Sequence, residues 1–207
     1  YDNSGAPVVT ISTPVPEGKY KTSSLAQISG TASDAFQIVS ASVAVRELDT
    51  NMCWSVVSGT FSVPSVAGPT CPDSVWYLVD TLVGGGIPAN YVWTKSTPPL
   101  GDGFRYQVAA RALDNSGNSN PPDYVNFLYD ITLPTSSVSV PAHGSFIKSL
   151  ASIEGIALDP QSPIPNPNPP VSFSGITGGG GVETAIRRNS DDAWWGGGSF
   201  GGAHAGQ

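Results

Sequence analysis

Apolar and polar residues alternate along most of the first 130 residues of this chain. The segment 39–48, VSASVAVREL, places an apolar side chain at every second position from Val39 to Val45, as a half-buried β-strand does. Pro, Gly, Asn and Ser cluster between such segments, where a strand has to turn. No segment keeps the i, i+3, i+4, i+7 apolar spacing of an amphipathic helix for three turns. The pattern predicts the strands Val8–Ser12, Ala26–Ala32, Val39–Leu48, Cys53–Val57, Thr60–Val63, Val75–Val79, Tyr91–Lys95, Phe104–Leu113 and Tyr124–Tyr129.

The start of this pattern occurs a second time. The chain opens YDNSGAPVVTIS, and YDITLPTSSVSV begins at Tyr129. A repeat of this length is the size of a domain. We therefore predict one complete module at 1–129 and a partial second module at 130–207, with a Pro/Gly-rich insertion at about 160–181 and a Gly-rich end. Six residues recur at a constant separation of 125: Leu25, Ala26, Ile28, Gly30, Ala32 and Asp34 match Leu150, Ala151, Ile153, Gly155, Ala157 and Asp159.

Three segments of the first module resemble the immunoglobulin-like tandem repeats of bacteria. LGDGFRYQVAARALDNSGN, at 100–118, is similar to their penultimate strand, and FLYDITLPT, at 127–135, is similar to their final strand and linker. ISGTASD, at 28–34, resembles their second strand. The resemblance implies an all-β, Ig-like antiparallel β-sandwich, in tandem copies within large secreted or cell-surface proteins such as adhesins and filament proteins. Tyr106 lies where such a sandwich has its tyrosine-corner residue, whose hydroxyl bonds the backbone.

Composition narrows the function classes. Only 12% of the residues are charged and the net charge is −7, so the surface disfavours nucleic acid and anionic membranes. No run of 18 apolar residues is present to span a bilayer. Cys53 and Cys71 flank a Gly/Pro/Ser-rich excursion, and we predict a disulfide that stabilises the fold by roughly 3 kcal/mol. A disulfide places the protein outside the reducing cytosol, and the resemblance implies an extracellular or cell-surface location.

The residues that carry chemistry are few. His143 and His204 lack metal-ligand partners at suitable spacing, and no nucleophile elbow, phosphate loop or zinc-protease motif occurs, so we predict that the chain is not an enzyme. Calcium is the one cofactor that the predicted topology favours, because oxygen-bearing turn residues recur at one end of each module. The same residue types are also ordinary turn formers. The candidate calcium ligands are Asp2, Asp34, Asp114 and Asn118, with Asn115 beside them, and Asp130 and Asp159 for the second module.

Tryptophans are the other candidates for contact with a partner. Trp54, Trp76 and Trp93 fit packing within the module better than a sugar-stacking surface. Trp194 and Trp195 are neighbours among glycines, and adjacent residues of a strand point to opposite faces. One of the two is therefore expected to face solvent, a partner protein or a surface glycan.

These observations favour a non-enzymatic structural or adhesive repeat segment of an extracellular surface or filament-forming protein, acting as a spacer and association module. The alternative is a carbohydrate-binding or accessory module of a secreted enzyme. The second module lacks a copy of the strands at 104–129, so an apolar face and open strand edges are expected there. Either the polypeptide continues beyond Gln207, or a neighbouring molecule supplies the missing strands by β-strand complementation. By the same pattern, Tyr1-Asp2 is expected to be the joint with a module upstream.

Overall fold

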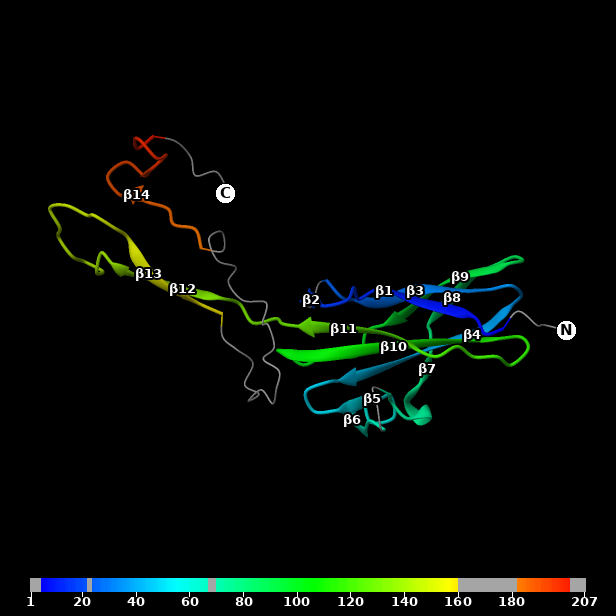
Figure 1. Cartoon of the computed structure of the whole chain (residues 1–207). Helices are drawn as coiled ribbons and strands as arrows, with labels where there is room; N and C mark the ends of the chain where they lie inside the picture. The colour runs from blue at the N-terminus through cyan, green and yellow to red at the C-terminus, as the bar shows by residue number, and fades with distance from the viewer. Residues whose placement is uncertain (1–4, 22–23, 67–69, 160–181, 202–207) are drawn as a thin grey trace. The chain divides into compact units, whose positions relative to one another are not determined.

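The computed structural model of the chain describes residues 5–21, 24–66, 70–159 and 182–201 (Figure 1). The chain divides into two units, with the boundary between Leu133 and Pro134. Apart from one 3-10 turn, η1 (Asp73–Val75), every regular element described is a β-strand. No helix of the described residues is long and apolar enough to cross a membrane. The predicted all-β fold is confirmed.

The first unit is a sandwich of two sheets, which Figure 1 shows as separate layers. All strand pairs are antiparallel except that of β2 and β11, which is parallel. One sheet has the order β1 (Val8–Thr13), β3 (Gln27–Asp34), β9 (Ala89–Ser96), β8 (Thr81–Gly85). The other has the order β2 (Gly18–Tyr20), β11 (Asp123–Tyr129), β10 (Phe104–Asp114), β4 (Ile38–Glu47), β5 (Met52–Ser55), β6 (Thr60–Pro64), with β7 (Tyr77–Leu78) also paired to β4.

The alternating pattern produces the core between the sheets. On β3, Ile28 and Ala32 are buried while Gln27 and Thr31 face solvent. Trp93 of β9 is fully buried and lies over Gly30, because a Cβ added to Gly30 would be 2.4 Å from the Trp93 ring and 1.9 Å from the carbonyl oxygen of Thr10. The Trp93 indole N–H donates to the carbonyl of Thr31 at 3.1 Å. Glycine at position 30 therefore lets strand and ring approach each other.

Tyr106 forms the predicted tyrosine corner. Its side chain is completely buried in β10, and its hydroxyl accepts a hydrogen bond from the backbone N–H of Gly101 at 2.7 Å. The Glu47 carboxylate and the Gly101 carbonyl are each 3.3 Å from the same hydroxyl. The ring stacks on Phe127 with 5.6 Å between centroids. The corner thus fixes the segment that leads into β10 against the core.

The predicted disulfide is also confirmed. Cys53 and Cys71 are bonded, with 5.9 Å between their Cα atoms, and both side chains are buried. They form a small second core with Ala44 and Val75. The disulfide fastens the excursion after β6 to the outer side of the larger sheet.

Backbone and side-chain hydrogen bonds tie the ends of the first unit together. The backbone N–H of Ile11, in β1, donates to the Asp123 carboxylate at the start of β11, which belongs to the opposite sheet. Where β11 ends, Asp102 accepts from the backbone N–H of Ile131 at 2.7 Å and from the Thr132 hydroxyl. The first and last strands of the unit are therefore linked directly.

Most predicted strands agree with the structure to within two residues, and the exceptions have local causes. The predicted strand Val75–Val79 is wrong in part, because its first residue belongs to η1 and only Tyr77 and Leu78 pair, with β4. β8 was not predicted, since its glycines read as a loop. β2 was not predicted either, because three residues are too few for a pattern.

In the second unit, β12 (Thr135–Val140) pairs with β13 (Glu154–Leu158) in the register that β1 forms with β3. Val8 lies opposite Ser33, and Thr135 opposite Leu158, offsets of 127 and 125 residues. All five pairs of each ladder correspond in this way, and both ladders shift register after the fourth pair. A Cβ on Gly155 would lie 2.2 Å from the Ser137 carbonyl oxygen, as one on Gly30 would approach that of Thr10.

The rest of the second unit contains little regular structure. β14 (Arg187–Arg188) and β15 (Ala193–Trp194) form a short hairpin. The predicted insertion at 160–181 lies outside the described residues. The expected boundary at 129/130 and the partial second module stay predictions.

Candidate functional site

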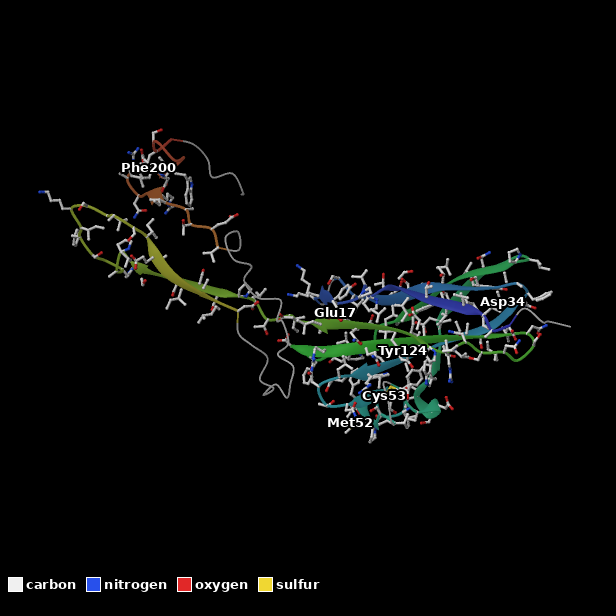
Figure 2. All side chains as sticks on the ribbon, in the orientation of Figure 1. Glu17, Asp34, Met52, Cys53, Tyr124 and Phe200 are labelled. Carbon is white, nitrogen blue, oxygen red and sulfur yellow. A yellow bond between two sulfur atoms is a disulfide. The ribbon has the colours of Figure 1, made fainter. Side chains whose placement is uncertain are left out.

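Three turns from distant parts of the sequence meet at one end of the first unit and enclose a pocket. They are the β3–β4, β8–β9 and β10–β11 turns. The backbone N–H of Asn115 donates to the carbonyl of Gln37 at 2.9 Å, which joins the first turn to the third. Figure 2 shows Asp34 at this end of the unit, away from Glu17 at the other. The pocket has a volume of about 480 Å³ and is lined by Phe36, Gln37, Gly86, Ile87, Tyr91, Asn115 and Ser116.

The lining combines exposed apolar side chains with neutral polar groups. Phe36 is 43% exposed and Ile87 is 83% exposed. Tyr91 supplies a half-buried ring, and the side chains of Gln37 and Asn115 supply amides. None of the seven lining residues carries a charged side chain. Such a surface can bind a ligand by apolar contact and by hydrogen bonds to the amide side chains.

Asp114 stabilises the third turn from inside. Its side chain is buried, and one carboxylate oxygen accepts hydrogen bonds from the backbone N–H groups of Ser116 and Asn118, each at 2.8 Å. The other oxygen accepts from the side-chain amide of Asn118, also at 2.8 Å. Burial alone would raise the pKa of Asp114, but these hydrogen bonds, with a further one from the backbone of Gly117, lower it below the ordinary value. The carboxylate is therefore charged, and both of its oxygens accept hydrogen bonds from its own turn.

Asp34, another candidate of the first module, lies at the same end of the unit as the Asp114 turn. Asp34 accepts from the backbone N–H of Phe36 at 2.8 Å in its own turn. Asp130 lies at the opposite end of the unit, where its backbone N–H donates to the carbonyl of Tyr20. Asp159 follows β13 in the second unit, and Asp2 lies outside the described residues.

A calcium site has no structural support among the residues described. No three His, Cys, Asp or Glu side chains there come together in a group that could hold a metal ion. Calcium therefore stays a prediction from the sequence. A calcium titration of the melting temperature tests it, and an unchanged midpoint at millimolar calcium would contradict it.

The tryptophans of the first unit are partly or fully packed. Trp54 lies edge-on to Phe61 with 5.2 Å between centroids. Trp76 donates its indole N–H to the Cys71 carbonyl at 3.2 Å, and the Arg111 guanidinium lies 4.2 Å from its ring centroid. These contacts fit the predicted packing roles.

Trp194 and Trp195 differ in exposure, as expected for neighbours on a strand. Trp195 is 44% exposed, and its ring lies 5.2 Å from that of Phe200. Trp194, at the end of β15, is less exposed and has the Arg187 guanidinium 6.0 Å from its ring centroid. Contact of either ring with a partner or glycan stays a prediction.

The loop pocket was not found by sequence reasoning. Six of its seven residues come from three turns, and Tyr91 comes from β9; the sequence of each segment, taken alone, is ordinary. The only signal was the exposed aromatic and aliphatic residues, Phe36 and Ile87, within otherwise polar or Gly-rich turns. No known protein family matches this chain, and no curated protein sequence does either.

Proposed function

We propose that this chain is a non-enzymatic structural and adhesive segment of an extracellular surface or filament-forming protein, where it serves as a spacer and association module. The observation that carries the proposal is that the chain forms two hairpins of the same design, β1–β3 and β12–β13. β12–β13 has the register, the register shift and the close-approach glycine of β1–β3. Tandem copies of a sandwich suit a protein that spans distance, because each copy adds length without new chemistry.

Two further features support an extracellular location for the protein. The disulfide between Cys53 and Cys71 is buried within the fold, and such bonds persist in oxidising compartments. The low charge and acidic balance give a surface that disfavours nucleic acid.

The test is the location of the native protein. Antibodies raised against this chain should label intact source cells, and brief protease treatment of those cells should remove the label. Electron microscopy of the labelled surface should then show extended projections or filaments. Label that appears only after the cells are permeabilised would contradict the proposal.

A carbohydrate-binding role is the second candidate, and the loop pocket favours it. Aromatic and amide side chains are the groups that contact sugars, and Phe36, Tyr91, Gln37 and Asn115 bring both types to one pocket. A glycan array should then give binding that is lost in Tyr91→Ala and kept in Trp195→Ala. Loss in Trp195→Ala alone would place the contact in the second unit, and an array without binding would remove this candidate.

A further inference from the structure

The strand β13 has one edge that nothing described occupies. Within the described part of the chain it pairs only with β12. The corresponding edge of β3 pairs with β9 along eight residues, from Gln27 opposite Ser96 to Asp34 opposite Ala89. The two hairpins therefore differ in one respect, since β3 has a partner strand on this edge.

The inner face of β13 corresponds to a face that is buried in the first unit. Ile153 and Ala157 stand at the positions of Ile28 and Ala32. Ile28 and Ala32 are at most 1% exposed, whereas Ile153, just before β13, is 36% exposed and Ala157 is half-buried. A strand edge with open hydrogen-bonding groups beside exposed apolar side chains is a template for another strand.

The glycine of β13 specifies what that strand should carry. In the first unit Gly30 pairs with Trp93, whose ring occupies the space where a glycine has no side chain. Gly155 has the same close approach to the strand before it, and it is exposed. Its uncovered face is thus shaped for an aromatic ring from a strand on the open edge.

We propose that the open edge of β13 accepts, in trans and antiparallel, an extended peptide strand of β9 chemistry. Apolar or aromatic side chains alternate along this strand, and a tryptophan pairs with Gly155. The register is that of β3 with β9, so the partner residue at the Val92 position pairs with Ile156. The inference rests on the proposed role as an association module and names the surface that associates.

The experiment uses the full chain and a synthetic peptide with the sequence of residues 80–97. This peptide contains β8 and β9, and the 2.6 Å ion pair between Lys95 and Asp80 lies within it. Hydrogen exchange is measured with and without the peptide. Backbone amides of residues 153–159 should exchange at least tenfold more slowly at saturating peptide, while amides of the first unit should keep their rates.

Two altered peptides provide matched controls. Trp93→Ala in the peptide should weaken binding at least tenfold, because the ring over the glycine is lost. Val92→Ala should change affinity less than threefold, since Val92 is on the outer face of β9 and is 56% exposed. A peptide of the same composition in scrambled order should not protect residues 153–159.

Three results obtained with the peptides would overturn the inference. They are unchanged exchange at 153–159 with millimolar peptide, equal binding of the Trp93→Ala peptide, and protection confined to the first unit. Protection of 153–159 that rises with protein concentration in the absence of peptide would identify a second copy of the chain as the occupant and would also overturn it. None of these results bears on cell-surface labelling, so the proposed function fails or holds separately.

Discussion

Tyr106→Phe tests how much the tyrosine corner contributes to the sandwich. The change keeps the ring, which stacks on Phe127, and removes only the hydroxyl. The backbone N–H of Gly101 then loses its acceptor at 2.7 Å, and the buried Glu47 carboxylate loses a neighbour at 3.3 Å. Leaving a buried donor unsatisfied costs about 1 to 3 kcal/mol. Because Gly101 is only half-buried, we expect a loss of about 1 to 2 kcal/mol in the free energy of unfolding.

Differential scanning calorimetry measures this loss. For a unit that ends at Leu133, a loss of 1 to 2 kcal/mol corresponds to a fall of about 4 to 7 °C in the melting temperature. Burial raises the pKa of Tyr106, so the hydroxyl is protonated throughout an assay near neutral pH. Tyr91→Phe is the matched control, because Tyr91 is only half-buried and lines the loop pocket.

The melting temperatures of the two variants together test whether the Tyr106 hydroxyl stabilises the fold. Tyr91→Phe should shift the melting temperature by less than about 2 °C, as most substitutions of partly exposed groups do. If Tyr106→Phe shifts it no further than Tyr91→Phe, the hydroxyl contributes nothing beyond its ring, and the corner does not stabilise the fold.

Three other changes probe separate parts of the first unit. Cys53→Ser removes a disulfide that closes a separation of 18 residues, and should lower the free energy of unfolding by about 3 kcal/mol. The denaturant midpoint of unfolding measures this loss. A reductant should lower the midpoint of the unaltered protein but not that of the variant. The hydrogen bond from Lys95 is the main cause that lowers the pKa of Asp80 to about 2. Asp80→Asn should therefore cost less than about 1 kcal/mol at pH 7, because the pair is partly exposed to solvent, and the cost should vanish as the pH falls from about 4 to below 2 in urea titrations. Gly30→Ala should cost about 3 kcal/mol or more by overpacking, whereas Gly198→Ala, which has open space around it, should be near neutral in the same titrations.

The sequence was sufficient for those parts of the fold that have a regular period or local chemistry. Strict alternation located β4 and β10 to within two residues, because one face of each strand is buried against the other sheet. Cys53 and Cys71 were paired correctly, since they are the only cysteines and flank one excursion. The role of Tyr106 was expected from the resemblance of residues 100–118 to the penultimate strand of immunoglobulin-like repeats.

The remainder depends on contacts between distant segments, which the sequence does not display. β2 becomes a strand only because β11 lies parallel beside it, and its three residues have no period to detect. Gly84 and Gly85 read as a loop, yet they extend β8 along β9. The pocket needs three turns to converge, and Asp114 was expected to face a cation although it is turned into its own loop. In each case tertiary contacts override local pattern.

The hydrogen bond between Ile11 and Asp123 has a mechanical consequence. β1 begins at the end of the unit that carries the loop pocket, and β11 leaves at the other end, so tension along the polypeptide pulls these strands in opposite directions along their lengths. Their ladders with β3 and β10 are then loaded in shear, in which many hydrogen bonds resist together, and the Asp123 carboxylate couples the two strands across the sheets. A single-molecule stretching experiment should find that Asp123→Ala lowers the unfolding force. A segment made this way would hold its length while whatever it joins is pulled.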